Sequence, residues 1–221
     1  MAMSLFMTLG ASACSEQENA IIPPTEEENN NGDTSGEENE GDTPTSDDIL
    51  IVYFSRTGEN YAVGTISVGN TTMMAGYIQE IVGGTLFEIT PEVPYPDSYE
   101  ATKLISQKER DENLRPAIKN KLNDLDKYST VFIGSPIWYG GPPMIMQTFY
   151  EAYPELAGKT IIPFGTHEGS GTASLATVLK QYFPNALIKQ TLGLTGREVR
   201  SSPTESRAAV KNWINRIGIT Q

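Results

Sequence analysis

The chain is poor in the residues that build several common kinds of site. Its 221 residues include one cysteine, Cys14, and one histidine, His167. A single cysteine cannot form an internal disulfide, and one cysteine with one histidine falls short of the ligands of a structural zinc site. No apolar run reaches the about 18 residues that a membrane-spanning helix needs. A disulfide scaffold, a zinc protein and a helical membrane span are therefore not expected.

Positive charge is also lacking where a nucleic-acid-binding protein would need it. The chain has 16 Lys and Arg against 28 Asp and Glu, and its net charge is −12. Residues 1–48 hold 12 of the acids and no Lys or Arg, so residues 49–221 carry 16 charges of each sign. Neither part has the basic excess that binding to nucleic acid or to an anionic membrane surface requires. We therefore expect no nucleic-acid partner, and membrane association only through an anchor.

Residues 1–14 are predicted to be a segment for secretion and lipidation. Residues 3–13 form a short apolar run typical of a signal peptide, and Cys14 directly follows Ala11, Ser12 and Ala13. This pattern resembles the site at which bacterial lipoproteins are cleaved and lipidated. The alternatives are ordinary signal-peptide cleavage, or a frayed terminus with an unrelated cysteine. Lipidation of Cys14 would anchor the protein to a bacterial membrane outside the cytoplasm, in the periplasm or at the surface.

Residues 15–48 are predicted to be a disordered acidic linker. They consist largely of Glu, Asn, Gly, Thr and Pro, with almost no apolar side chains. A segment of this composition cannot bury enough apolar surface to fold, and its charges favour extended conformations. The folded domain is therefore expected at residues 49–221.

From residue 49 onwards, short apolar runs alternate with segments of helical periodicity. Five runs are predicted strands, at residues 49–54, 85–89, 130–133, 160–164 and 186–188. The last helix has a predicted capping box at residues 202–205 (SPTE), with proline at the first helical position. This alternation predicts an α/β fold, a doubly wound five-stranded parallel sheet with helices on both faces. In such sheets, ligands bind beyond the carboxyl ends of the strands, where the strand order reverses.

The loop after the first predicted strand is suited to a phosphate group. Residues 55–60 (SRTGEN) offer hydroxyls, loop N–H groups and an amide, and a helix is predicted to begin near residues 70–72 (NTT). Hydrogen-bond donors together with a helix N-terminus favour a bound anion. The alternative is an ordinary polar turn that caps a helix without a ligand.

The loops after the third and fourth predicted strands favour a flat ligand. Trp138 and Tyr139 lie between glycines and prolines in residues 134–143 (GSPIWYGGPP), although turns normally expose small polar residues. Three glycines in residues 165–171 (GTHEGSG) allow a ligand to approach the backbone closely. Packing of the two aromatic residues onto their own domain is the alternative. A hydrolase that uses Ser170 and His167 is disfavoured, because no acid is placed to orient the histidine.

Together these loops resemble the flavodoxin family, which holds flavin mononucleotide (FMN) at this edge of the sheet. The likeness covers residues 48–221 and rests on motifs at residues 55–60, 69–71 (GNT), 94–99 (PYP…Y), 115–116 (RP), 134–140 (GxPIWxG) and 163–171 (PFxTHxGSG). It implies a flavodoxin-like fold and FMN as the cofactor.

The resemblance also implies the residues that bind FMN. The phosphate would contact the residues Ser55, Thr57, Gly58, Asn60 and Thr71, with Arg56 in the same loop. The isoalloxazine ring would be lined by Pro136, Ile137, Trp138, Tyr139 and Gly140. The other side of the ring, or the ribityl chain, would border Thr166, His167, Gly169, Ser170 and Gly171. No catalytic side chain and no metal ligand is assigned.

Two features depart from the family pattern, and the crossover after the second predicted strand is unusually long. An insertion separates Asn60 from Asn70, and the third loop lacks a stacking aromatic residue, which would leave one ring face open to a substrate. The segment 90–127 is longer than a simple crossover. Within it, residues 99–111 are predicted to be a charged helix, interpreted as a surface crossover; a cap over the flavin is the alternative.

The resemblance implies an FMN-dependent redox protein with an unknown redox partner. It would be either an electron carrier or a small reductase that passes hydride from NAD(P)H to a quinone-type acceptor. The neutral charge of residues 49–221 favours the reductase, because typical carriers dock their partners through an acidic surface. The competing hypothesis is a flavin-free binding module on the same scaffold. A homodimer is compatible with either function.

Overall fold

The computed structural model describes residues 44–219 of the chain. The predicted signal segment, the lipidation site Cys14 and most of the predicted linker lie outside the described residues. Within the described range, no helix is both long and apolar enough to span a membrane.

The centre of the fold is a parallel β-sheet whose strands follow the order β4-β1-β5-β6-β7. Strand β7 pairs with the first residues of β6, and β8 pairs with the last residues of β6. The strands are β1 (Ile49–Tyr53), β4 (Thr85–Glu88), β5 (Thr130–Pro136), β6 (Thr160–His167), β7 (Leu187–Ile188) and β8 (Leu192–Thr195). The five predicted strands are all present, whereas β8 was not predicted. The expected doubly wound parallel sheet is confirmed.

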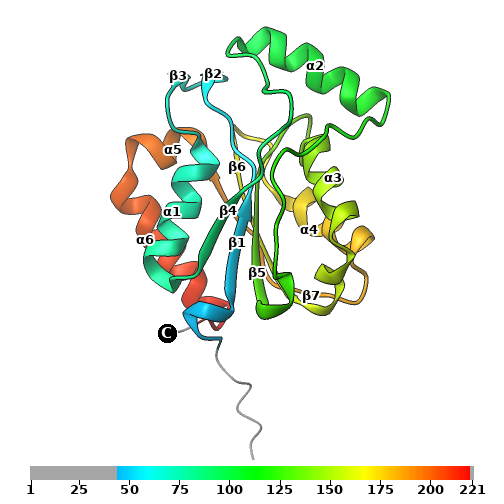
Figure 1. The fold of residues 1–221 in the computed structure, drawn as a ribbon. Coiled ribbons are helices and arrows are strands. Elements are labelled where there is room, and N and C mark those ends of the chain that lie inside the picture. Colours follow the sequence, from blue (N-terminus) through cyan, green and yellow to red (C-terminus); the bar gives the residue numbers. More distant parts are fainter. Residues whose placement is uncertain (1–43, 220–221) are drawn as a thin grey trace, which may run out of the picture. The chain divides into compact units, whose positions relative to one another are not determined.

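The described residues also form helices, and all but α2 (Tyr99–Asp111) cover the faces of this sheet. The others are α1 (Asn70–Val82), α3 (Met144–Ala152), α4 (Ala173–Tyr182), α5 (Gly196–Ser201) and α6 (Pro203–Arg216). Figure 1 shows α1, α5 and α6 on one face and α3 and α4 on the other. Helix α2 lies apart from both layers, above the end of the sheet where the strands finish.

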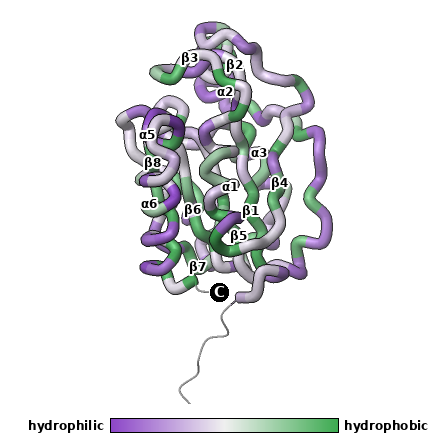
Figure 2. Tube along the Cα trace, turned by 90° about the vertical axis from the view of Figure 1, so that its left-hand side faces the viewer, coloured by the Kyte–Doolittle hydropathy of each residue, from purple (hydrophilic) through white to green (hydrophobic). Residues whose placement is uncertain are grey.

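The alternation of side chains along β1 explains why both faces need a cover. Ile49 and Ile51 belong to the core that packs against α1 and α6, whereas Leu50 and Val52 belong to the core against α3 and α4. All five residues of β1 are buried. A strand that is apolar on both sides is stable only between two helical layers. The hydrophobic segments accordingly concentrate along the central strands (Figure 2).

The predicted capping box at residues 202–205 is wrong, although Pro203 does begin α6. The Ser202 side chain makes no capping hydrogen bond, because α5 runs almost directly into α6. Ser202 instead joins the two helices, since its N–H donates to the Glu198 carbonyl and its own carbonyl accepts from the Ser206 N–H. The capping box of this region lies at the start of α5, where the Thr195 hydroxyl accepts from the Glu198 N–H at 3.1 Å and the Glu198 carboxylate accepts from the Thr195 N–H at 2.8 Å.

Candidate functional site

A cavity of about 380 Å³ lies at the carboxyl ends of β1, β5 and β6. The strand order reverses here, because β1 has β4 on one side and β5 on the other. This is the position at which doubly wound sheets bind ligands, and the volume lies within the usual range of small-molecule sites.

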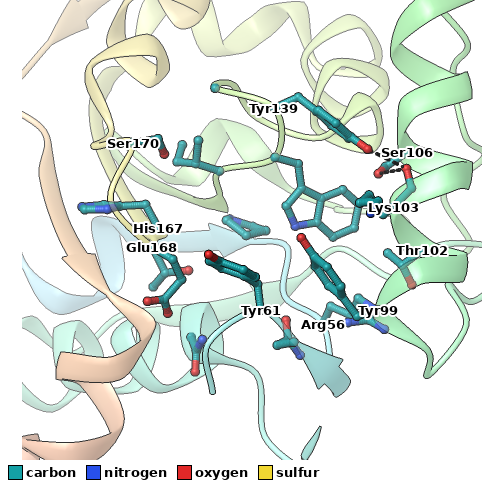
Figure 3. Close-up of a pocket in the computed structure, with 17 residues that line it drawn as sticks. Arg56, Tyr61, Tyr99, Thr102, Lys103, Ser106, Tyr139, His167, Glu168 and Ser170 are labelled. Carbon is teal, nitrogen blue, oxygen red and sulfur yellow. Dashed lines mark hydrogen bonds between the residues drawn. The ribbon is translucent and has the colours of Figure 1, made fainter. Parts of the chain in front are cut away.

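Two walls made from different parts of the chain enclose the cavity (Figure 3). The sheet wall is formed by residues that end or follow β5 and β6: Pro136, Ile137, Trp138, Tyr139, Gly140, Thr166, His167, Glu168 and Ser170. The outer wall is formed by Tyr61 together with one face of α2: Tyr99, Thr102, Lys103 and Ser106. Arg56, Asn60 and Asn70 complete the lining.

A tight turn positions the two aromatic residues of the sheet wall. The N–H of Trp138 donates to the Gly141 carbonyl at 2.8 Å, and the N–H of Gly141 donates back to the Trp138 carbonyl at 3.1 Å. The two central residues have positive φ angles, 50° for Tyr139 and 81° for Gly140. Such a turn suits glycine, but it strains a tyrosine. Strained backbone of this kind is concentrated at functional sites.

Trp138 joins the sheet wall to the core. Its ring lies edge-on to Tyr95, with centroids 5.1 Å apart, and edge-on to Phe54 at 5.7 Å. The sequence offered the alternative that the loop aromatics pack on their own domain. Trp138 does so in part, because it packs against the core, but it also lines the cavity. Tyr139 remains exposed at the rim.

The insertion between Asn60 and Asn70 contributes to the outer wall. Strands β2 (Gly58–Asn60) and β3 (Gly64–Ile66) form an antiparallel hairpin, and Tyr61 lies at its tip. The Tyr61 ring lies beside that of Tyr99, with centroids 5.9 Å apart and an angle of 32° between the planes. Two aromatic side chains from outside the third loop thus border the cavity.

Helix α2 is predicted correctly, but its interpretation as a surface crossover alone is wrong. Four of its residues, Tyr99, Thr102, Lys103 and Ser106, line the cavity. The face that α2 turns towards the protein is polar, because its buried residues are Thr102, Ser106 and Glu109. A helix without an apolar stripe has the sequence pattern of a solvated surface helix, which explains the error.

Polar contacts hold α2 over the cavity. The Arg56 guanidinium donates to the carbonyls of Pro96 at 2.6 Å and Asp97 at 2.8 Å, just before the helix begins. The N–H of Tyr99 donates to the Glu59 carboxylate at 3.0 Å. At the rim, the Tyr139 hydroxyl donates to the Lys103 carbonyl at 2.9 Å. Residues 56–59 after β1 and the turn after β5 are therefore bonded to α2 or to the segment just before it.

A buried tyrosine–glutamate pair also links α2 to the sheet wall. The Tyr95 hydroxyl donates to the Glu109 carboxylate at 2.9 Å. Burial raises the pKa of the Glu109 carboxyl, and this hydrogen bond opposes the rise in part. Burial, followed by the charge of Glu109, raises the pKa of Tyr95. The same tyrosine packs on Trp138, so the contact extends from α2 to the turn after β5.

The N-terminus of α1 lies beside the cavity, where Asn70 is its first residue. The preceding residue, Gly69, has no side chain with which to cap the helix. The Ser55 hydroxyl instead accepts from the Thr72 N–H at 3.1 Å. A Cβ atom at position 69 would lie 2.0 Å from that hydroxyl, so only glycine allows this approach. Arg200 brings a positive charge here and donates to the Asn70 side chain at 2.7 Å. Such a helix end favours an anion.

His167 and Glu168 occupy the end of the sheet wall. The Nδ1 atom of His167 accepts from the Gly169 N–H at 3.0 Å. One carboxylate oxygen of Glu168 pairs with the Arg197 guanidinium at 3.2 Å. Within residues 44–219, no group of three or more His, Cys, Asp and Glu residues is arranged to hold a metal ion.

The structure brings most of the predicted site residues to one cavity. Those that line it are Arg56, Asn60, Pro136, Ile137, Trp138, Tyr139, Gly140, Thr166, His167 and Ser170. Those that do not line it are Ser55, Thr57, Gly58, Thr71, Gly169 and Gly171. Two hydroxyls among the second group bond within the protein, since Ser55 accepts from Thr72 and Thr71 shares a 2.8 Å hydrogen bond with Thr166.

Seven lining residues were not assigned to the site from the sequence: Tyr61, Asn70, Tyr99, Thr102, Lys103, Ser106 and Glu168. Tyr99 and Asn70 belong to the quoted motifs, which was an available signal. No such signal marked four other side chains of the outer wall, Tyr61, Thr102, Lys103 and Ser106. Their positions depend on how the insertion and α2 fold over the sheet.

Comparison with known proteins agrees with this architecture. Residues 48–217 match the flavodoxin family, described as "Flavodoxin". The chain therefore belongs to the flavodoxin family. No match was found among curated proteins.

Among solved structures, the chain is similar to two candidate flavoproteins from Bacteroides. That of Bacteroides eggerthii DSM 20697 is 33% identical, with 78% of this chain and 98% of that chain covered and a TM-score of 0.61. That of Bacteroides uniformis ATCC 8492 is 30% identical, with 77% and 99% covered and a TM-score of 0.60. A flavoprotein from Lactobacillus acidophilus NCFM, solved in complex with FMN, is 21% identical, with 72% and 99% covered and a TM-score of 0.53. This third likeness shows the fold alone.

Proposed function

We propose that the cavity binds FMN and that the protein is an FMN-dependent redox protein. The observation that carries the proposal is the aromatic-walled cavity at the strand-order reversal of a flavodoxin-family sheet, with the N-terminus of α1 beside it. When bound, FMN supplies electron and hydride transfer, while the protein supplies binding, orientation and exclusion of competing reactions.

The aromatic side chains of both walls fit a flat ring. Trp138 and Tyr139 border the cavity from the sheet wall, and Tyr61 and Tyr99 border it from the outer wall. Offset or edge-on packing between aromatic groups is favourable beyond the area that it buries. The phosphate group would lie at the N-terminus of α1, where the N–H groups and the Arg200 guanidinium favour an anion.

Two unsatisfied polar atoms provide an independent test of the fit. Among the described residues, the buried side-chain nitrogen and oxygen atoms without a hydrogen-bond partner are Arg56 Nε and Glu168 Oε1. Both belong to residues that line this cavity. Buried polar atoms in native proteins almost always have a partner. Arg56 Nε lacks an acceptor and Glu168 Oε1 lacks a donor. This pair of lining residues supports a polar ligand that offers both.

The redox role that we favour is a small NAD(P)H-dependent reductase rather than an electron carrier. Residues 49–221 carry equal numbers of acidic and basic residues, which leaves no acidic excess for docking a carrier's partner. A quinone-type acceptor fits the aromatic surroundings of the cavity. The test is to mix FMN-loaded protein with NADH or NADPH without oxygen and to follow the flavin absorbance. Bleaching supports the reductase, and flavin that stays oxidised for hours would contradict it.

FMN binding itself is tested by titrating the flavin-free protein with FMN while following flavin absorbance and fluorescence. Tight binding should quench the fluorescence, because the wall aromatics would contact the ring. Absence of binding at micromolar FMN would overturn the redox proposal and favour the flavin-free binding module.

We further propose that lipid on Cys14 attaches the protein to a membrane outside the cytoplasm. The proposal rests on the apolar run of residues 3–13 and on the small residues before Cys14. Stable attachment needs more than one acyl chain, because a single chain binds only marginally. Bacteria that express the full chain with labelled palmitate should show label on the protein, and Cys14→Ser should remove it. Label that persists in Cys14→Ser would contradict lipidation at this residue.

A further inference from the structure

Between Thr166 and Gly171, Glu168 occupies the one position that the flavodoxin-family motif leaves variable. It follows His167, the last residue of β6, and the exposed fraction of its side chain is 14%. Its Oε2 atom pairs with Arg197 Nε at 3.2 Å. The other carboxylate oxygen, Oε1, is buried.

The Oε1 atom of Glu168 is sealed from solvent and has no hydrogen-bond partner among the described residues. Gly196, at the start of α5, leaves the space in which it lies. A Cβ atom at position 196 would be 2.6 Å from this oxygen and 2.1 Å from the Asn70 amide nitrogen. The unpartnered oxygen is therefore next to the first residue of α1, and a larger residue at position 196 would displace it.

A buried carboxylate oxygen without a donor is costly, and the cost is removed when a ligand donates to it. A phosphate group cannot play this role, because it is an anion that offers acceptors. The carbonyl groups of a flavin ring are also acceptors, and its one donor, the N3–H, lies on the edge of the ring away from the chain that leads to the phosphate. Hydroxyl groups on an aliphatic chain can donate, and a chain that joins a ring to a phosphate must pass close to the N-terminus of α1.

The position of Glu168 in the cavity agrees with a contact to such a hydroxylated chain. Figure 3 shows His167 and Glu168 on the opposite side of the cavity from Lys103 and Ser106 of α2. Tyr139 is bonded to Lys103, so the exposed aromatic residue of the sheet wall lies towards the α2 side. Glu168 instead adjoins Asn70 and α1. The guanidinium groups of Arg197 and Arg200 offset its negative charge near the expected phosphate position.

We propose that Glu168 is a ligand-binding residue whose Oε1 atom accepts a hydrogen bond from a hydroxyl of the ligand's polyol chain. The inference rests on the proposed function and specifies how the same site selects a flavin nucleotide with a hydroxylated chain. It assigns Glu168 a role in specificity for the polyol, and no role in electron transfer.

The test compares two ligands that differ only in these hydroxyls. One is FMN, and the other is an FMN analogue with the same ring and phosphate joined by an unsubstituted five-carbon chain. Dissociation constants are measured by fluorescence for the full chain and for Glu168→Gln, which keeps the shape and removes the charged acceptor. Because both ligands carry the phosphate, a general change in electrostatics cancels in the ratio of the two constants.

The unsubstituted protein should prefer FMN over the analogue, and Glu168→Gln should reduce that preference about tenfold, the typical effect of losing a hydrogen bond to a charged group. Glu168→Asp keeps the charge but withdraws the oxygen by one methylene, so it should reduce the preference as well. It also serves as the second variant if Glu168→Gln does not fold. The matched control is Glu80→Gln, which removes a carboxylate paired with Arg207 on the surface and should leave the preference unchanged.

Three results would overturn the inference. They are an unchanged preference in both Glu168 variants, an equal loss of affinity for both ligands, and no preference in the unsubstituted protein. Failure of the proposed function gives a different result, since the unsubstituted protein would then bind neither flavin and the inference would fall with it.

Discussion

The two walls of the cavity are built in different ways. The sheet wall continues from β5 and β6, and the first six residues of β5 are buried. The outer wall comes from a hairpin tip and from α2, which buries only polar residues and is held by hydrogen bonds to Arg56, Glu59 and Tyr139. Burial of apolar surface fixes the sheet wall, whereas exchangeable polar bonds fix the outer wall. Changes in the sheet wall should therefore affect stability and binding together, and changes in the outer wall should affect them separately.

The largest expected effect is that of Trp138→Ala in the sheet wall. The partly buried ring packs on Phe54 and Tyr95, so its removal leaves these two core side chains without a packing partner. We expect the free energy of unfolding to fall by about 3 kcal/mol and FMN binding to be lost. Urea denaturation and FMN titration of the same preparation measure both. A fall of less than about 1 kcal/mol, against the cost usual for such a truncation, would show that the packing of Trp138 on Phe54 and Tyr95 contributes little to stability.

Arg56→Met tests how the outer wall is attached. The guanidinium donates to the carbonyls of Pro96 and Asp97, and both acceptors would lose this charged donor. We expect the amides of α2 to exchange with solvent more readily, by about 2 kcal/mol in local opening free energy, while the amides of β5 stay protected. Native-state hydrogen exchange measures this. Arg207→Met, which breaks an exposed pair with Glu80, is the control and should leave α2 unchanged.

Tyr61→Ala should separate ligand binding from stability. The side chain is 62% exposed and lies in the outer wall. We expect the FMN affinity to fall about tenfold through the loss of an aromatic contact, and the free energy of unfolding to stay within about 0.5 kcal/mol. Leu187→Ala removes an apolar side chain of similar exposure at the opposite end of the sheet and should change neither quantity. Equal losses of affinity in the two variants would refute the role of Tyr61.

The smallest expected effect is on the pH dependence of stability, and it comes from Glu109 in the Tyr95–Glu109 pair that connects the two walls. Burial raises the pKa of Glu109, so the folded protein holds this proton more tightly than the unfolded chain. As pH rises from the ordinary carboxyl pKa through the raised value, this group should therefore lower the free energy of unfolding. Glu109→Gln should flatten that part of the pH profile, because glutamine does not titrate and can still accept from Tyr95. Urea unfolding at a series of pH values measures the slope, and an unaltered slope would contradict the assignment.

The sheet and the sheet wall could be predicted because local sequence determines both. Apolar runs such as residues 49–54 have no stable place except inside a covered sheet, and the loops that follow them must meet at one edge. Strand β8 was missed because LGLT is short and only half-buried. Helix α3 was missed because its apolar residues follow directly on a loop rich in glycine and proline.

The outer wall could not be predicted because its position depends on contacts between distant segments. Tyr61 meets Tyr99 only when the hairpin and α2 converge over the sheet, and no periodicity in either segment indicates this. The hydroxyl of Thr71 was expected to face a phosphate, whereas it meets Thr166 across the fold. Contacts of this kind follow from tertiary packing and cannot be inferred from the pattern of one segment.

The two ends of the described chain have a practical consequence for handling the protein. The chain enters β1 beside the C-terminal end of α6, at the amino ends of the strands, and Ile219 packs in the same cluster as Ile49 (Figure 1). The cavity lies at the other end of the sheet. A fusion partner, an affinity resin or an electrode surface joined at either end would thus leave the mouth of the cavity open to solution, and a biosensor could be assembled in either orientation of the gene fusion.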